Sequence, residues 1–313
     1  MTTVIRAARR AELPAIFNLL ELAFPEASRA LFVAQTERDS TFRLRHGRVV
    51  LLDGEVAAYV RIFARTMLVG GRPLPAGGIG SVATHPGARG RGLASALMRD
   101  AIEQMRRERM QVSFLFTGIP RFYAPFGYRI IRQPYFDADP REAALAPHSG
   151  LYDVRGAEAG DVPRLLAIYR RAVAASTGAI ARTRRTWRDA THWLTEDDDG
   201  CFVAERNGLP AAYLRSRCRA YGHEIIEAEC LPGHEDAIIA LLARVGGRAI
   251  EQGERIASTA PDDHQLTMAL RLLPSTRESA PLHPMMVRAL TDDPPIDAAF
   301  EREPLHYWNS DRI

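Results

Sequence analysis

The sequence predicts a mixed α/β fold made of two consecutive units of similar design. Three observations support this prediction. A short apolar strand runs through a loop of glycine and arginine into an amphipathic helix at residues 80–98. Asp53–Gly54 and Asn207–Gly208 each join two apolar runs, as the tight turn of a β-hairpin does. The strand and helix that open the chain recur after residue 151, so the second half repeats the first.

The elements of the first unit follow in a clear order. Val4–Arg6 reads as a strand, and residues 10–14 lead into a helix with an apolar face. A hairpin is predicted at residues 49–60, and a second turn at Val69–Arg72 returns the chain to the strand before the loop. The order of strand, helices, three antiparallel strands, helix, strand and helix predicts one mixed sheet with helices on its faces.

The loop Gly87–Gly92 has the features of an anion site. The first amides of the helix after it lack intrahelical partners and lie at the positive end of the helix dipole. Gly90 and Gly92 let the backbone approach a diphosphate, and Arg89 and Arg91 add charge and fork-shaped donors. A P-loop is excluded because the chain has no lysine: all 41 of its basic residues are arginine. The alternative is a tight connection that binds nothing.

This segment resembles the phosphate-binding strand–loop–helix of the GNAT superfamily of acyl-CoA N-acyltransferases. The family loop usually reads Gln/Arg-x-x-Gly-x-Gly/Ala, and the sequence departs from it only at Gly87. The resemblance implies that acetyl-CoA is the cofactor, with its pantetheine arm on the strand edge at Val82, Ala83 and Thr84. The residues implied to hold the diphosphate are Arg89, Gly90, Arg91, Gly92, Leu93, Ala94 and Ser95. His85, just before the loop, is either a catalytic residue or part of a turn.

A second part of the resemblance follows the predicted strand Val112–Phe116. GNAT enzymes carry a Phe-Tyr-x-x-x-Gly-Phe/Tyr stretch there, and Phe122–Tyr128 matches it. The family tyrosine protonates the departing CoA thiolate, which implies that Tyr123 is the general acid. The alternative is that Tyr123 only packs the short helix on the sheet, as we expect for Tyr128. Gly118 and Ile119 are expected to pass near the cofactor.

Composition limits the remaining function classes. With 313 residues and 46% hydrophobic residues, two domains with packed cores are expected. The N-terminus lacks the pattern of a signal peptide and no apolar run suggests a membrane span, so we expect a cytoplasmic protein without membrane contact. Three cysteines without a Cys-x-x-Cys pattern favour reduced thiols and no metal site. A net charge of +3 does not favour nucleic acid as a partner.

We expect the units to divide at residues 140–151, with a catalytic GNAT domain at 1–140 and a degenerate GNAT-like domain with a C-terminal tail at 151–313. Ile225–Ala228 and Asp236–Gln252 correspond to the strand and helix of the cofactor site. The loop between them has one glycine, with Glu235 and Asp236 where a diphosphate would lie. Because this charge has the wrong sign for a phosphate group, the second unit is predicted to have lost CoA binding.

This tandem of one active and one silent unit resembles the Eis-type (enhanced intracellular survival) acetyltransferases. Those proteins carry a further sterol-carrier-like domain, which we do not expect within these 313 residues. Members of that type acetylate amines of small molecules or peptides, and their terminal carboxylate acts as a base. The resemblance therefore implies that the aromatic tail Glu303–Ile313 returns to the first domain and offers Ile313 or Asp311 there. A tail that seals the groove between the domains is an equal alternative.

These observations together predict an acetyl-CoA-dependent N-acetyltransferase with direct transfer to a primary amine of a small molecule or peptide. The amine is expected between Phe17–Arg38 and the second domain, where Glu21, Glu26 and Glu37 either attract it or are ordinary solvated charges. The alternative from another class is a non-catalytic tandem module that binds acyl-CoA and acts through a partner. The length of the acyl group and assembly into homo-oligomers are left open.

Overall fold

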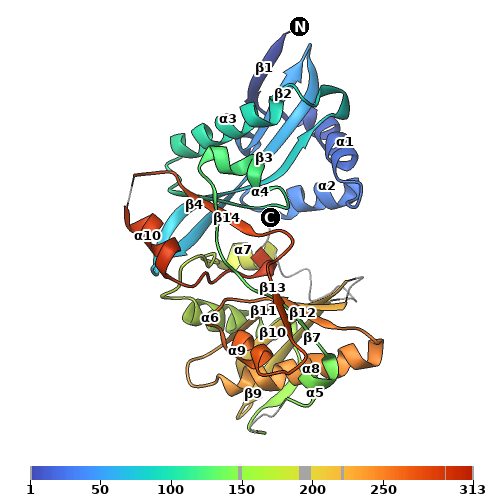
Figure 1. The fold of residues 1–313 in the computed structure, drawn as a ribbon, viewed down its shortest axis with the longest axis vertical. Coiled ribbons are helices and arrows are strands. Elements are labelled where there is room, and N and C mark those ends of the chain that lie inside the picture. Colours follow the sequence, from blue (N-terminus) through green and yellow to red (C-terminus); the bar gives the residue numbers. More distant parts are fainter. Residues whose placement is uncertain (1, 147–149, 190–198, 220–221, 293, 312–313) are drawn as a thin grey trace.

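The computed structural model describes residues 2–146, 150–189, 199–219, 222–292 and 294–311 (Figure 1). Within these residues the chain forms two seven-stranded sheets of mixed strand direction, one in each half of the molecule. The predicted mixed α/β fold with two tandem units is therefore confirmed. None of the described helices combines the length and the apolar character needed to cross a bilayer.

The first sheet lies between two layers of helices. Its strands, in spatial order, are β1 (Thr3–Ala7), β2 (Gly47–Leu52), β3 (Glu55–Val69), β4 (Arg72–Thr84), β5 (Val112–Phe116), β14 (Met285–Ala289) and β6 (Arg129–Ile130). Helices α1 (Leu13–Ala23) and α2 (Arg29–Arg38) share a core with Tyr59, while α3 (Leu93–Arg107) shares one with Ala58 and Val60. Neighbouring residues of β3 thus face opposite sides, as the alternation of a strand requires.

The second sheet repeats this design. Its strands, in spatial order, are β13 (Arg277–Ser279), β7 (Tyr135–Ala138), β12 (Ile256–Thr259), β11 (Gly222–Cys230), β10 (Leu209–Arg219), β9 (Asp199–Arg206) and β8 (Asp153–Gly156). The helices of this half are α5 (Pro140–Ala144), α6 (Val162–Ala172), α7 (Arg184–Asp189), α8 (Asp236–Gln252) and α9 (Gln265–Arg271). The predicted helix at Asp236–Gln252 is confirmed residue by residue.

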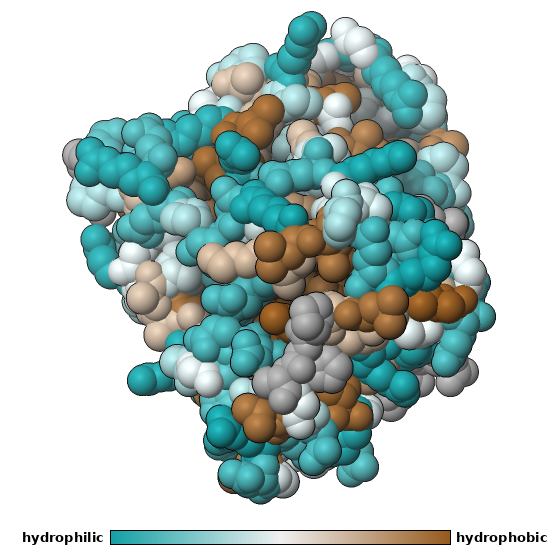
Figure 2. Space-filling model, turned by 60° about the horizontal axis from the view of Figure 1, so that its bottom comes forward, coloured by the Kyte–Doolittle hydropathy of each residue, from teal (hydrophilic) through white to brown (hydrophobic). Residues whose placement is uncertain are grey.

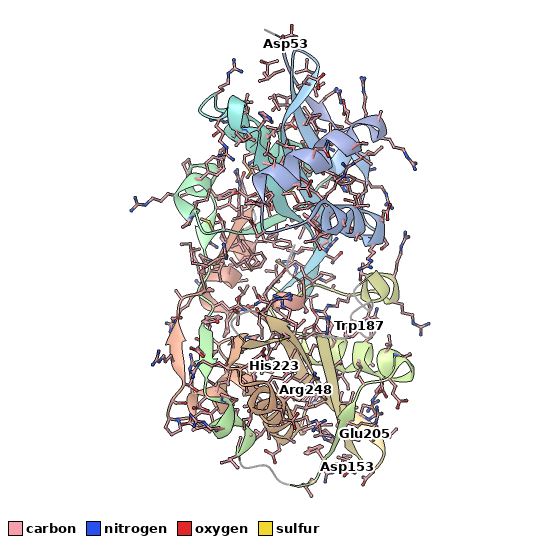
Figure 3. All side chains as sticks on the ribbon, turned by 90° about the vertical axis from the view of Figure 1, so that its right-hand side faces the viewer. Asp53, Asp153, Trp187, Glu205, His223 and Arg248 are labelled. Carbon is pink, nitrogen blue, oxygen red and sulfur yellow. The ribbon has the colours of Figure 1, made fainter. Side chains whose placement is uncertain are left out.

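The predicted turns have the expected backbone. Asp53 and Gly54 have φ values of 49° and 93°, and Asn207 and Gly208 have 55° and 74°. Two consecutive left-handed residues form the two-residue turn that matches the twist of a hairpin. Figure 3 shows Asp53, which belongs to the first turn, and Glu205, which lies shortly before the second, near opposite ends of the molecule.

The sheets exchange one strand each. β14 comes from the second half of the sequence, yet it lies between β5 and β6 of the first sheet and pairs Val287 with Phe114. β7 comes from the first half, yet it lies between β12 and β13 of the second sheet. Helix α10 (Pro294–Arg302) follows β14 and packs Ile296 and Phe300 in the core beside it. Each sheet therefore contains one strand from the other side of the predicted division at residues 140–151.

The tail after α10 lies between the two sheets. Leu305 and Tyr307 belong to a core that includes β5 and β14, whereas Trp308 belongs to the core of the second half. His306 points to the second half as well, with Nε2 2.6 Å from Glu229 Oε1. Successive side chains of this extended segment therefore enter opposite halves of the molecule. On the face drawn in Figure 2, hydrophilic side chains predominate and apolar ones form separate patches.

Candidate active site

Strands β4 and β5 part at one end of the first sheet. Their parallel ladder runs only from Ala76–Ile79 on β4 to Val112–Leu115 on β5, although β4 continues to Thr84. A bulge at this point, where Ser81 has a φ of 53°, turns the strand away from its neighbour. The described residues place no strand against Val82–Thr84 on the β5 side, so that edge is open.

The loop after β4 leads directly into the start of α3. Gly90 and Gly92 have φ values of 74° and 73°, a left-handed backbone that favours glycine. Gly92 is the N-cap of α3 and has no side chain to bond the first amides of the helix. Within the described residues the first α3 bond runs from Ala96 N to Gly92 O at 3.0 Å. The helix therefore begins with amides that an anionic ligand can occupy.

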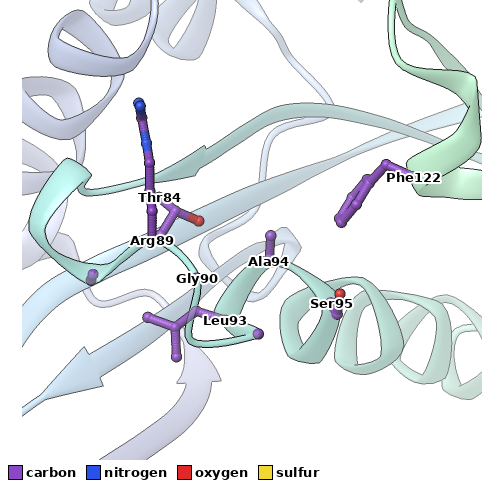
Figure 4. A pocket seen from close by; sticks show the side chains of 9 residues that line it. Thr84, Arg89, Gly90, Leu93, Ala94, Ser95 and Phe122 are labelled. Atoms are coloured by element: carbon purple, nitrogen blue, oxygen red, sulfur yellow. The ribbon is translucent and has the colours of Figure 1, made fainter.

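A hollow of about 240 Å³ lies over this loop (Figure 4). Seven of the predicted cofactor residues line it, namely Thr84, Arg89, Gly90, Gly92, Leu93, Ala94 and Ser95. Ala88 and Phe122 complete the lining, and Figure 4 shows the Phe122 ring extending from α4 (Pro120–Tyr123) toward Ala94. Five predicted residues lie outside the lining: Val82, Ala83, Arg91, Gly118 and Ile119. Phe122 was not among the predicted cofactor residues, and its place in the lining follows only from the fold.

Tyr123 is the last residue of α4, directly after Phe122, and is not among the residues that line the hollow. Its side chain is 7% exposed, and its ring packs edge-on against Phe122 and Tyr128 with centroid distances of 4.8 and 6.3 Å. Burial raises the pKa of the Tyr123 hydroxyl to about 12. No residue of the described chain forms a hydrogen bond with this hydroxyl, so its proton is not committed to a protein acceptor.

Tyr128 differs from Tyr123 in this respect. Its hydroxyl lies 2.6 Å from Ser113 Oγ, and Ser113 Oγ donates to Gly77 O at 2.9 Å. Burial raises the pKa of Tyr128 above its ordinary value. The bonds fix the turn after α4 to β5 and β4, which is the packing role expected for this residue.

The other candidate side chains near the loop make local contacts. His85 is exposed, and its Nδ1 accepts a hydrogen bond from Gly87 N at 3.2 Å, which stabilises the turn. Glu21, Glu26 and Glu37 are all exposed, and Glu21 Oε1 accepts from Arg29 N at 3.2 Å. These contacts favour the turn role of His85 and the solvated role of the three carboxylates.

The second half has different chemistry at the equivalent place. Counting back from the ends of β4 and β11, Ser81 corresponds to Glu227. Glu227 is fully buried and accepts from Arg182 at 2.7 and 2.9 Å, with Arg215 at 3.3 Å. At the start of α8, Glu235 Oε1 accepts from Gly233 N at 3.0 Å. A buried ion cluster and an acidic helix start therefore replace the open edge and the arginine loop.

The predicted base candidates lie at the end of the tail. Asp311 ends a 3-10 turn, η7 (Asn309–Asp311), that packs beside β11, and Ile313 lies outside the described residues. Among the described residues, no group of three or more histidine, cysteine, aspartate or glutamate side chains is arranged to hold a metal ion.

Comparison with known proteins identifies the first half. The sequence model of the acetyltransferase (GNAT) domain matches residues 4–131, which hold the open strand edge, the loop and Tyr123. A curated relative, an uncharacterized N-acetyltransferase of Streptomyces avermitilis, is 31% identical over 237 residues, or 70% of this chain. The chain spans 56% of the length of that relative.

Comparison with solved structures identifies the architecture. A GCN5-related N-acetyltransferase from Kribbella flavida matches with a TM-score of 0.74 and 21% identity, over 94% of this chain and 73% of its own. Eis1 from Mycobacterium abscessus matches with a TM-score of 0.65 and 20% identity, over 92% and 74%. These similarities show a shared fold that extends across both halves. Residues 4–131 are therefore a GNAT acetyltransferase domain, and the fold of the two halves together is similar to that of Eis1.

Proposed function

We propose that the protein is an N-acetyltransferase that moves the acetyl group of acetyl-CoA directly to a primary amine. The observation that carries this proposal is the open edge of β4 at Val82–Thr84, which runs straight into the loop and the uncapped start of α3. The amides of a pantetheine arm can pair with a strand edge, and a diphosphate can bind helix amides and arginine. One continuous segment thus offers both kinds of contact in the order that acetyl-CoA requires.

Tyr123 is proposed as the general acid of the reaction. The amine attacks the thioester carbon, the C–N bond forms, and the C–S bond breaks as the sulfur takes the Tyr123 proton. With a pKa of about 12 the phenol stays neutral at physiological pH and can donate this proton. The amine proton leaves to water or to a carboxylate of the tail, where Ile313 and Asp311 are the proposed candidates. Fixing both substrates side by side supplies much of the rate through orientation.

Thiol release from acetyl-CoA in the presence of a panel of primary amines tests the proposal. We expect Tyr123→Phe to lower kcat by about 10²- to 10⁴-fold while the KM for acetyl-CoA changes little. Tyr152→Phe is the matched control, because its hydroxyl lies 3.1 Å from His234 Nδ1 in the second half, away from the loop. The double change Arg89→Ala/Arg91→Ala should raise the KM for acetyl-CoA.

Two results would contradict the proposal in different ways. If acetyl-CoA binds but no amine stimulates thiol release, the chain acts as an acyl-CoA-binding module. If acetyl-CoA does not bind, the loop has been assigned wrongly. Full activity of Tyr123→Phe would show that Tyr123 is not the general acid, and would leave the assignment of the cofactor site unaffected.

A further inference from the structure

The second half keeps the parting of two strands that the first half has at the proposed cofactor site. β11 pairs with β12 only through His223–Ile225, and Ile225 lies as far from the end of β11 as Ile79, the last residue of β4 in its ladder with β5, lies from the end of β4. Within the described residues no strand pairs with Ile226–Cys230 on the β12 side. This edge is therefore the counterpart of the open edge at Val82–Thr84.

Side chains of the tail bind to this edge of the second half. Glu229 Oε1 accepts from Trp308 Nε1 at 2.7 Å and lies 2.6 Å from His306 Nε2. Two residues before Glu229 on the same strand, Glu227 accepts a hydrogen bond from Ser310 Oγ. The protein's own tail thus lies where the first half leaves an edge open for a ligand.

Tyr307 lies between two of these anchoring residues of the tail and points into the first half. It is 1% exposed, and its ring centroid is 5.1 Å from that of Phe116 and 6.0 Å from that of Phe114. Gln133 Nε2 donates to Tyr307 O at 2.6 Å, which fixes the backbone of the tail on this side as well. Because close-packed rings leave little room for movement, Tyr307 holds the ring of Phe116 in position.

Phe116 lies where β4 and β5 part. It follows Leu115, the last residue of β5 that pairs with β4. Leu115 and Tyr123 fill the side toward α3, where they are 1% and 7% exposed. Phe116 packs on the opposite side and lines a cavity of about 600 Å³ there. With the proposed cofactor on the open edge of β4, the acyl group lies at this point, and a longer acyl chain meets Phe116.

We propose that Tyr307 is a positioning residue that limits the cofactor to short acyl groups by holding Phe116 against the acyl end. The cleft of the second half serves to anchor the tail that carries Tyr307. The inference rests on the proposed N-acetyltransferase function. One methylene group in a closely fitting pocket changes recognition by about 10- to 200-fold, so a wall held in this way is sufficient to select acetyl-CoA.

Titration calorimetry with acetyl-CoA and butyryl-CoA tests this inference without an acceptor. We expect the wild type to bind acetyl-CoA at least about tenfold more tightly. Tyr307→Ala should remove most of this difference, because Phe116 can turn into the space that the ring leaves, whereas Tyr307→Phe keeps the ring and should retain the preference. Phe300→Ala is the matched control: Phe300 is 5% exposed in the same core, on α10, and its loss should leave the ratio of the two Kd values as in the wild type.

A pair of tryptophan variants tests the anchor. Trp308 and Trp187 are 1% and 2% exposed in the core of the second half, and Trp308 belongs to the tail whereas Trp187 belongs to α7. Trp308→Leu removes the hydrogen bond to Glu229 and should lower the preference for acetyl-CoA several-fold, in the same direction as Tyr307→Ala. Trp187→Leu should leave the preference unchanged. Thermal midpoints check that all the variants fold.

The outcomes separate this inference from the function on which it rests. Equal affinities of the wild type for the two thioesters, or an unchanged preference in Tyr307→Ala, would overturn the inference and leave the N-acetyltransferase in place. An unchanged preference in Trp308→Leu would overturn the role of the second half as the anchor. A chain that binds neither acetyl-CoA nor butyryl-CoA would refute the proposed function itself.

Discussion

Two adjacent glycines of α8 lie in opposite surroundings. A Cβ on Gly246 would be 2.4 Å from Ala144 N and 2.9 Å from Ala143 C, which are backbone atoms of α5 that cannot move aside easily. A Cβ on Gly247 would meet no atom within 4 Å. We expect Gly246→Ala to lower the free energy of unfolding by about 1–3 kcal/mol through overpacking. Gly247→Ala should raise it by about 0.5–1 kcal/mol, because alanine favours the helix.

Urea unfolding followed by circular dichroism measures both changes. Gly247→Ala is the control for the effect of alanine on helix propensity, which the two variants share. If Gly246→Ala proves as stable as Gly247→Ala, the close contact between the backbones of α5 and α8 at Gly246 would be contradicted.

The pKa of Tyr123 has a consequence for the pH dependence of the reaction. Because burial raises this pKa to about 12, the hydroxyl keeps its proton far above neutrality. We therefore expect no loss of kcat from ionisation of Tyr123 between about pH 7 and pH 10, the range below an ordinary phenol pKa. A profile of kcat against pH, measured with the fold monitored in parallel, checks this. An alkaline fall with an apparent pKa near 9 would argue against a buried phenol as the acid.

At the scale of elements, the tail is held by a buried ion pair. Glu229 Oε1 accepts from Trp308 Nε1 at 2.7 Å and lies 2.6 Å from His306 Nε2, and His264 Nε2 is 3.7 Å from Oε2. Burial alone would lower the pKa of His306, but the Glu229 carboxylate outweighs it and raises that pKa above its ordinary value. Burial alone would raise the pKa of Glu229, but His306 and His264 hold it well below its ordinary value.

These shifts predict how docking of the tail depends on pH. A raised His306 pKa stabilises the docked tail fully below the unfolded value of about 6.5, and this stabilisation is lost as the pH rises through the folded value. The lowered Glu229 pKa matters at acidic pH. Its stabilisation of the docked tail is complete above the unfolded value of about 4.3 and is lost progressively as the pH falls below that value. We therefore expect the tail to be held most firmly between about pH 4.5 and pH 6.5.

The fluorescence of Trp308 measures whether the tail is docked. The Trp308 emission spectrum is the difference between the spectra of the wild type and Trp308→Phe, and this spectrum should shift toward that of a solvated indole as the pH rises above neutrality. His306→Gln keeps a hydrogen-bond donor but does not titrate in this range, so the shift should be absent from it. A shift of equal size in His306→Gln would assign the effect to another group.

Local elements were predictable because their signals lie close together in the sequence. Asp53–Gly54 requires a left-handed backbone in two consecutive residues, and the loop before α3 carries its glycines within three positions. The exchange of β7 and β14 could not be predicted in this way. Met285–Ala289 reads as an ordinary apolar strand, and its choice of partner depends on contacts with residues far away in the sequence.

The candidate site shows the same difference between features made by one continuous segment and features made by residues far apart in the sequence. The hollow over the loop was predicted because one continuous segment supplies most of its lining, and Tyr123 was indicated by a short motif. By contrast, a cavity of about 600 Å³ between the two sheets is lined by Phe116, Glu224 and Asn309, which come together only through folding. Local patterns in the sequence give no signal for such a set, since no spacing relates its members.

At the scale of the whole molecule, the strand exchange predicts a single cooperative unfolding transition. Neither sheet can lose its exchanged strand without exposing a row of unpaired backbone groups in its neighbour. Circular dichroism and Trp308 emission should therefore report the same midpoint in urea. Two separate midpoints would show that the halves unfold independently.

A pair of valine variants refines this test. Val287 on β14 is 1% exposed, whereas Val4 on β1 is 40% exposed. We expect Val287→Thr to lower the free energy of unfolding by about 1–3 kcal/mol, because it buries a hydroxyl without a ready partner. The whole transition should move together and not split. Val4→Thr, the same chemical change at an exposed position, should leave the midpoint nearly unchanged.

The position of β14 also bears on how the protein is made. A ribosome releases β5 early, but the strand that covers its other side, Met285–Ala289, emerges long after it. Domains usually fold from the N-terminus as they appear, whereas here the half that carries the loop and Tyr123 must wait until β14 has been made. A chain that stops before β14 would therefore lack a finished first sheet, and with it the support of the proposed cofactor site.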